Sequence, residues 1–528
     1  MVHITIRSCT DRVRILLLQR TMHSQRSHSV TNNPGPHPIR KSPWKVRTMN
    51  TSTVSSKSAA AAGVSGTDLE SFLAQDGRED EIARIRSEID ASGVTYIYYQ
   101  FVSVTGRIMG KAAPAEHWER LAHTGFQLVY GSTANLFIDR NDDYIGYGPD
   151  AWELVGLPET DTFQVLPWDK RTARVFCTLF RGREEEKDPA AYLSSDCRGN
   201  LRRIHQEFEE QTGLHLRVGT EPEMMWLKLN PDGTPSVEGK TKPYCYHIDQ
   251  FAELQPIIHR VIDYSQAMGL NMIQGDHEDG PGQLELNWEF DRAELTADRL
   301  TTYRQICRQV GREFDVFPCF MPKPFMGVSA NSCHHNMSLW KGDENMFMPD
   351  TDNVRMPGRI GLQALGGILD HLDALTCVTA PTVNSYRRLW DTGFWAPVYA
   401  NWGFQNRTTT VRVSAPGRFE YKATDSSVNP YLSCAALIKA MADGISRDLD
   451  PGPQESRSSY EITSGENERR IPMNLGAALD ALDQDSVVKS ALPGEMLQVF
   501  THYKRDEWER FCSTVTQWDV DEYLDVLP

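Results

Sequence analysis

The segment from Val218 to Leu227 places the strongest constraint on the fold. It reads VGTEPEMMWL and combines the apolar and aromatic content of a buried strand with two carboxylates, Glu221 and Glu223. Side chains two positions apart on a strand point to the same face of the sheet. Two buried carboxylates on one face repel each other, and each is costly to desolvate. The segment therefore predicts a strand with positive charge beside it, unless one carboxyl group stays protonated.

Further acidic residues stand inside or at the ends of apolar segments later in the chain: Glu278, Glu285 and Glu420. His334 has a similar setting. Five carboxylates and one imidazole suit two divalent cations such as Mg²⁺ or Mn²⁺, and such a pair of cations would also remove the repulsion described above. The alternative is a set of separate buried ion pairs with nearby arginines. Six such residues together favour the metal interpretation.

Basic residues recur in the same half of the chain. Arg407 and Arg412 lie in one predicted strand segment, with Arg388 and Lys422 nearby in sequence. Arginine binds phosphates and carboxylates through two parallel hydrogen bonds. Together with metal ions, such residues indicate phosphoryl transfer from a nucleotide, although solvated surface arginines are the simpler alternative. The chain has no P-loop and no GxGxxG motif, so the nucleotide site is of another kind.

The first 60 of the 528 residues contain ten Lys and Arg residues and one acidic residue, whereas the whole chain has a net charge of −16. We expect a disordered, basic, Ser/Thr-rich extension over residues 1–66. Two other origins fit this composition. One is an organellar transit peptide, and the other is a translation start at Met49.

Two domains are predicted after this extension. The residues from Val94 to Val104 alternate and are rich in Tyr and Phe, and the turn at Gly106 follows, which indicates a β-hairpin. A charged run that ends in Asp188-Pro189 is typical of a linker. We therefore predict an N-terminal domain over residues 67–187 and a catalytic domain over residues 188–528. Helical spacing of apolar residues predicts helices over 201–212, 248–268 and 293–314.

Composition excludes some classes of function. A net charge of −16 argues against a nucleic-acid-binding protein. No apolar run approaches the roughly 20 residues that a membrane span needs, so no membrane partner is expected. The ten Cys residues include no CxxC pair and are interpreted as free thiols in a reducing compartment. We therefore expect a cytoplasmic protein.

From about residue 82 onward the chain resembles the glutamine synthetase family. The resemblance rests on these motifs: Glu221-Pro-Glu223, His277-Glu278-x-x-Pro-Gly-Gln-x-Glu285, Phe320-Met-Pro-Lys-Pro, His334 before Met-Ser-Leu, Asn384-Ser-Tyr-x-Arg388, Asn406-Arg407-x4-Arg412, and Glu420 with Asn429-Pro-Tyr-Leu. It implies an α+β fold with a small N-terminal β-grasp domain and a large C-terminal α/β catalytic domain. It also implies a ring-type homo-oligomer, a dodecamer, with active sites between neighbouring subunits.

The resemblance also implies roles for single residues. Glu223, Glu278 and Glu285 would hold one metal ion. The second metal ion, which bridges to ATP, would be held by Glu221, His334 and Glu420. Arg407 and Arg412 would stabilise the transferred phosphate and contact the nucleotide, as would Ser338 and Asn336. Arg388 and Lys422 would bind glutamate, with Lys422 in place of the family's usual arginine.

Two positions depart from the family pattern. The family binds ammonium with two acids, one before Gly-Ser in the N-terminal domain and one before Ala-Pro in a flexible flap. Here these positions are Tyr130 and Trp395. Neither side chain is a carboxylate, so the Coulombic attraction for ammonium is lost. Two aromatic side chains would instead form a more apolar, cation–π-capable pocket for a bulkier amine.

These residues together predict an ATP-dependent ligase that joins the γ-carboxyl group of glutamate to an organic amine through γ-glutamyl phosphate. The acceptor class would be a polyamine, ethanolamine or an aromatic amine, as in the γ-glutamylpolyamine synthetase branch of the family. The first alternative is an ordinary glutamine synthetase, and the second is a non-catalytic, lengsin-like structural protein. The second alternative predicts lost metal ligands, whereas all six are present. Tyr460 lies nearest to a tyrosine that is adenylylated in some family members, but its surroundings match poorly.

Overall fold

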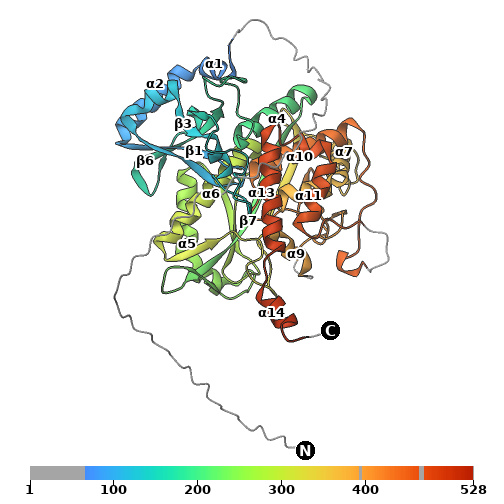
Figure 1. Ribbon diagram of the computed structural model, residues 1–528. Coiled ribbons are helices and arrows are strands. Elements are labelled where there is room, and N and C mark those ends of the chain that lie inside the picture. Colours follow the sequence, from blue (N-terminus) through green and yellow to red (C-terminus); the bar gives the residue numbers. More distant parts are fainter. Residues whose placement is uncertain (1–65, 392–394, 463–468, 527–528) are drawn as a thin grey trace, which may run out of the picture. The chain divides into compact units, whose positions relative to one another are not determined.

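The computed structural model describes residues 66–391, 395–462 and 469–526, all within one compact unit (Figure 1). The predicted extension over residues 1–66 lies outside these residues, apart from Gly66. None of the described helices is both long enough and apolar enough to cross a membrane. The boundary between residues 187 and 188 stays a prediction, because the contacts do not separate the chain there.

The N-terminal part contains one six-stranded sheet, and β5 pairs with β6 beside the strand order β2-β1-β6-β4-β3. The predicted hairpin is present, since β1 and β2 pair antiparallel around the turn at Gly106. The strands are β1 (Tyr96–Val102), β2 (Ile108–Pro114), β3 (Phe126–Val129), β4 (Glu153–Pro158), β5 (Gln164–Leu166) and β6 (Asp169–Phe180). The helices are α1 (Asp68–Leu73), α2 (Arg78–Ser92) and α3 (Trp118–Thr124).

The catalytic part is built on an 11-stranded sheet with the order β15-β16-β17-β13-β7-β10-β9, and the four remaining strands pair with β7 or β13. The long strand β7 lies between β13 and β10 and contains the predicted strand segment. The main strands are β7 (His215–Leu229), β9 (Met272–His277), β10 (Gln283–Trp288), β13 (Cys333–Lys341), β15 (Trp402–Phe404), β16 (Val411–Ala415) and β17 (Arg418–Tyr421). The strands outside this order are β8 (Pro235–Gly239), β11 (Asp291–Arg292), β12 (Val316–Cys319) and β14 (Glu344–Asn345).

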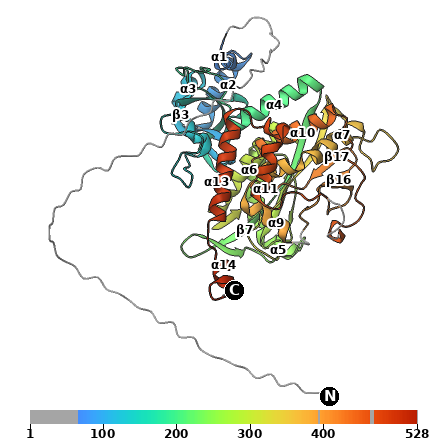
Figure 2. The same ribbon diagram turned by 45° about the vertical axis from the view of Figure 1, so that its right-hand side comes forward.

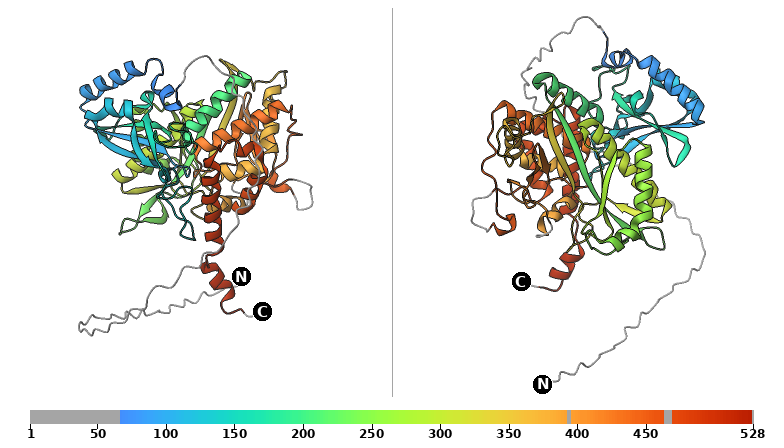
Figure 3. Two further views of the ribbon diagram at one scale, coloured as in Figure 1. Left: turned by 45° about the horizontal axis from the view of Figure 1, so that its top comes forward. Right: turned by 180° about the vertical axis from the view of Figure 1, so that it is seen from behind.

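Side-chain alternation along β7 and β10 gives the sheet one apolar face and one acidic face. Met224 and Trp226 on β7, with Leu284 and Leu286 on β10, belong to one buried apolar cluster. Helices α5 (Ile248–Ala267) and α6 (Ala293–Glu313) pack on that cluster, beside the long green strand in the rear view (Figure 3). The residues between these apolar positions therefore point to the opposite face. This confirms that Glu221 and Glu223 share one face, and Glu285 joins them there.

A second and larger apolar core lies under the remaining helices. Helix α10 (Pro430–Ser446) packs beside α4 (Cys197–Thr212) and α7 (Arg359–Asp370), as Figure 2 shows, and its buried residues run from Pro430 to Gly444. The predicted helix over 201–212 is the C-terminal part of α4, and Gly213 ends it in the left-handed conformation, with φ 72°. The other helices here are α4 (Cys197–Thr212), α7 (Arg359–Asp370), α8 (Leu372–Thr379), α9 (Arg387–Trp390), α11 (Leu475–Gln484), α12 (Ser486–Lys489), α13 (Glu495–Cys512) and α14 (Gln517–Tyr523).

Candidate active site

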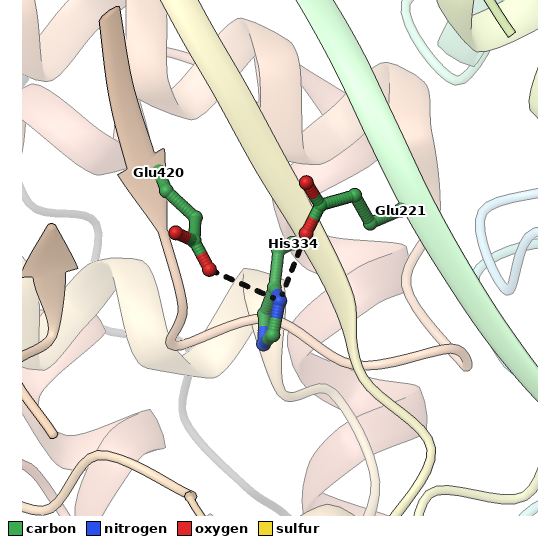
Figure 4. Close-up of side chains that lie close together, drawn as sticks. All are labelled: Glu221, His334 and Glu420. Atoms are coloured by element: carbon green, nitrogen blue, oxygen red, sulfur yellow. Dashed lines mark hydrogen bonds and ion pairs between the residues drawn. The ribbon is translucent and has the colours of Figure 1, made fainter. Parts of the chain in front are cut away.

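Glu221, His334 and Glu420 meet on the acidic face of the sheet. Glu221 on β7 is paired in register with His334 on β13, and β13 in turn pairs with β17, which carries Glu420. The Nδ1 atom of His334 lies 3.3 Å from a Glu221 carboxylate oxygen and 3.4 Å from one of Glu420 (Figure 4). One ligand atom from each residue lies within 4.8 Å of the other two. This spacing would allow all three side chains to bind one metal ion.

The protonation states of this group suit a metal ion. Burial raises the pKa of Glu221, but the hydrogen bond and charge of His334, the hydrogen bond from Asn336 and the charge of Lys422 together bring that pKa to about 2. Burial, followed by the charge of Lys422, lowers the pKa of His334. An ionised carboxylate and a neutral imidazole are the forms that coordinate divalent cations.

The second predicted group, Glu223, Glu278 and Glu285, lies on the same face of the sheet, and its carboxylates repel one another. Glu285 pairs in register with Glu223, and Glu278 directly follows β9. Burial, and then the charge of Glu278, raise the pKa of Glu223 to about 8. Burial, and then three neighbouring glutamates, also raise the pKa of Glu285. A divalent cation among these carboxylates would remove the repulsion, so the donor set fits a hard metal ion.

The basic residues occupy two different environments. Arg412 contacts the ligand group directly, because its Nη1 donates to Glu420 at 2.7 Å. Arg407 is exposed, which leaves its guanidinium accessible to a phosphate. Arg388 and Lys422 are only 2% and 3% exposed. Arg388 donates to the Ser332 hydroxyl at 3.0 Å, and the Nζ atom of Lys422 lies 3.7 Å from Glu420.

The two residues predicted to contact the nucleotide also have partners within the chain. The side-chain amide of Asn336 donates to Glu221 at 2.8 Å and so orients this predicted ligand. The hydroxyl of Ser338 accepts a hydrogen bond from the Trp340 indole at 2.8 Å. Asn336 therefore stands beside the metal group, whereas a nucleotide contact by either residue stays a prediction.

The two aromatic residues at the predicted amine pocket differ in position. Trp395 is half-exposed, and its backbone N–H donates to the Tyr460 hydroxyl at 2.7 Å. Tyr130 is 3% exposed and belongs to the apolar core, where its hydroxyl donates to Glu185. The Tyr130 ring is thus buried in its own chain, and its predicted contact with an amine stays a prediction.

Several supporting residues escaped the sequence reasoning. Gln283 and the backbone N–H of Ser332 both donate to Glu223, and the Ser426 hydroxyl donates to the Glu223 carbonyl. Asp276 on β9 pairs in register with Glu285 on β10 and adds another carboxylate to the acidic face. Asp276 could have been found from its spacing to Glu278, because residues two apart on a strand share a face. Ser332 and Ser426 carry no such local signal.

Comparison with known proteins agrees with this geometry. The family profile described as "Glutamine synthetase, catalytic domain" matches residues 194–523. Two relatives named glutamine synthetase come from Pyrococcus furiosus and Rhizobium leguminosarum bv. phaseoli. The first is 33% identical over 453 residues and the second 34% identical over 445 residues, and in each alignment 82% of this chain and 97% of the relative are covered. The chain belongs to the glutamine synthetase family.

Solved structures similar to this glutamine synthetase family member give the same result. Structures described as "GmaS/ADP complex-Conformation 1" and "Apo GmaS without ligand" match it with TM-scores of 0.75 and 0.74 at 28% identity. Each alignment covers 84% of this chain and 99% of the other. The predicted mixed α and β fold is thus confirmed. The chain is an ATP-dependent carbon–nitrogen ligase of the glutamine synthetase type, a family that acts on glutamate, ATP and an amine and uses divalent metal ions.

Proposed function

We propose that this family member transfers the γ-glutamyl group to an organic amine, with polyamines as the acceptor class. The observation that carries the proposal is Trp395, a half-exposed indole at the position where the family places an acid that binds ammonium. An indole offers an apolar surface and a cation–π contact in place of a full negative charge. Both properties favour an alkylammonium compound with a hydrocarbon chain over the small, strongly hydrated ammonium ion.

The remaining residues support the first half of the reaction. Glu221, His334 and Glu420 would hold one divalent cation, and Glu223, Glu278 and Glu285 a second. Such cations, when bound, supply positive charge that neutralises the phosphate oxygens of ATP. Arg407, which is exposed, and Arg412, which contacts Glu420, would hold the transferred phosphate in line with the γ-carboxylate of glutamate. The ADP named with one similar structure supports a nucleotide site of this type.

The proposed reaction has two steps, and the second forms the carbon–nitrogen bond. The γ-carboxylate of glutamate first takes the terminal phosphoryl group of ATP, and ADP leaves. The acceptor first loses one proton to solvent, and its neutral nitrogen then attacks the acyl carbon of γ-glutamyl phosphate. The carbon–oxygen bond to phosphate breaks, and the proton that leaves the nitrogen goes to the released phosphate. Arg388 and Lys422 are proposed to bind glutamate, although their depth and their contacts to Ser332 and Glu420 also suit a role in orienting those residues. A ring-type dodecamer remains part of the proposal.

An ordinary glutamine synthetase is the second candidate, and the names of the relatives at 33–34% identity favour it. A non-catalytic, lengsin-like role is disfavoured by the complete set of acidic and His ligands. The deciding experiment gives the full-length protein ATP, Mg²⁺ and glutamate with ammonia, ethanolamine, putrescine, spermidine or an aromatic amine. Phosphate release gives kcat/KM for each acceptor, and mass spectrometry identifies the product. A higher kcat/KM for ammonia than for every amine would overturn the proposed acceptor.

A further inference from the structure

The backbone at Trp395 has a conformation that a bulky side chain rarely adopts. Its φ angle is +63°, in the left-handed region. In this region the Cβ of an L-residue crowds the backbone, so residues other than glycine, Asn and Asp are uncommon there. Such a conformation persists only where surrounding contacts hold it. Trp395 therefore needs a partner that fixes its backbone.

Tyr460 is that partner. The backbone N–H of Trp395 donates to the Tyr460 hydroxyl at 2.7 Å, across 65 residues of sequence. Tyr460 is 41% exposed, and burial of the rest of its ring raises the pKa of the hydroxyl, which keeps the phenol neutral. The Tyr460 hydroxyl thus accepts the hydrogen bond from the Trp395 backbone N–H at a fixed position. Its own position then decides where the Trp395 backbone, and with it the indole, is held.

The segment that carries Tyr460 is itself fastened to the phosphate side of the proposed site. The side-chain amide of Asn406 donates to the backbone carbonyls of Glu455 and Arg457, at 3.0 and 2.8 Å. The backbone N–H of Ser459 donates to the Thr408 hydroxyl at 2.8 Å. Asn406 and Thr408 flank Arg407, which lies in the turn between β15 and β16 rather than in the predicted strand segment. One short segment therefore contacts both this turn and Trp395.

We infer that Tyr460 is a positioning residue for the acceptor amine. It holds the Trp395 indole in a fixed position relative to the Asn406–Thr408 segment. This inference rests on the proposed role of Trp395. Tyr460 does not touch a reacting atom in this account. Its hydroxyl lowers the cost of the left-handed backbone at Trp395 and so limits the number of orientations that the indole can adopt.

The test replaces Tyr460 with phenylalanine, which removes the hydroxyl and keeps the ring. We expect KM for the best acceptor to rise about 5–10-fold, as the loss of one hydrogen bond predicts, while KM for ATP and glutamate changes less than twofold. In a Trp395→Gly background, the further change Tyr460→Phe should leave the acceptor KM unchanged, because glycine adopts positive φ without support. Tyr399→Phe is the matched control, because Tyr399 is a nearby buried tyrosine whose hydroxyl contacts Ile462 and Arg470.

The outcomes separate this inference from the proposed acceptor. Wild-type protein that prefers ammonia overturns the proposed function, and the inference is then judged on KM for ammonia. An unchanged acceptor KM in Tyr460→Phe overturns the inference. So does an equal rise in the Trp395→Gly background, since the effect would then not pass through Trp395. A rise in the KM values of ATP, glutamate and acceptor alike would indicate a general structural role and would also overturn it.

Discussion

Glu285 on β10 and Glu223 on β7 face each other in register, and both carboxylates point away from the apolar core. Burial, followed by repulsion from neighbouring carboxylates, raises the pKa of both groups. A raised carboxyl pKa means that folding takes up a proton near neutral pH, so this pair destabilises the metal-free protein there. Replacing one of these two carboxyl groups should therefore change the stability of the metal-free protein and the binding of metal in opposite directions.

Glu223→Gln is therefore expected to stabilise the metal-free protein while abolishing the stabilisation that Mg²⁺ or Mn²⁺ gives. The gain in unfolding free energy at pH 7 should be on the order of 2 kcal/mol, because a neutral amide replaces a repelled carboxyl group. Turnover should fall about 100-fold or more through loss of a ligand. Thermal unfolding with EDTA and with added metal measures the first two effects.

Glu289→Gln is the matched control for this variant, because Glu289 is exposed and its contacts to Arg299 and Asn271 are made by its backbone. It should change neither the metal-free stability nor the metal response. Full turnover of Glu223→Gln would refute the two-metal interpretation.

Trp395→Glu should move acceptor preference toward ammonia. A carboxylate at this position restores Coulombic attraction for ammonium, and about 1.4 kcal/mol of such attraction corresponds to a tenfold change. We expect kcat/KM for ammonia to rise about tenfold and that for the best organic amine to fall by a similar factor. Trp390→Glu places the same charge five residues earlier, on a side chain that is 67% exposed, and should leave the preference unchanged. Identical acceptor profiles for both variants would remove Trp395 from the amine pocket.

His371 predicts a pH-dependent contribution to stability. Its ring nitrogens lie 2.7 Å from Asp485 and 3.0 Å from Asp443, and although burial opposes it, these carboxylates raise the pKa of His371 above 6.5. A raised folded-state pKa gives stability that is fully present below about pH 6.5 and is lost as pH rises through the folded-state value. His371→Gln should therefore cost about 1–2 kcal/mol in acid and progressively less at alkaline pH. Urea unfolding over a pH series, with exposed His259→Gln as control, tests this; a cost that does not change with pH would contradict it.

Arg198 on α4 forms a buried ion-pair network with Asp298 on α6 and with Glu159, which directly follows β4. It donates to both oxygens of Asp298, at 2.9 Å each by its closest contacts, and its Nη1 atom lies 3.4 Å from Glu159. Removing one member of a buried pair leaves an uncompensated charge. Arg198→Met should therefore cost about 3–5 kcal/mol of unfolding free energy. The double change Arg198→Met with Asp298→Leu should recover part of that cost, and a double variant less stable than the single one would contradict the argument.

Local patterns in the sequence were sufficient for much of the site. The i,i+2 spacing of Glu221 and Glu223 predicted a shared face, because a strand alternates its side chains regardless of what surrounds it. The recurrence of acids at apolar segments likewise identified Glu285 and Glu420, which the sheet brings to that face. Ordered motifs over more than 200 residues, from Glu221 to Leu432, identified the family.

Contacts between distant segments lay beyond that reasoning. Tyr130 had the correct position relative to a short motif, but burial against Glu185 and the apolar core depends on residues far along the chain. Asn336 gave no sign that it would orient Glu221, since the pairing of β13 with β7 brings them together. The same holds for Ser332 beside Glu223.

The sequence by itself determined the α+β class, the acidic face of the central sheet and the set of side chains that chemistry of this type requires. These follow from alternation, residue type and spacing, which act over a few residues. Only the tertiary structure decided which aromatic residue stays exposed, that Asn336 orients Glu221, and that Tyr460 holds Trp395. The physical reason is that burial and hydrogen bonding between elements depend on which distant segments pack together. A pattern over a few residues carries no information about that packing.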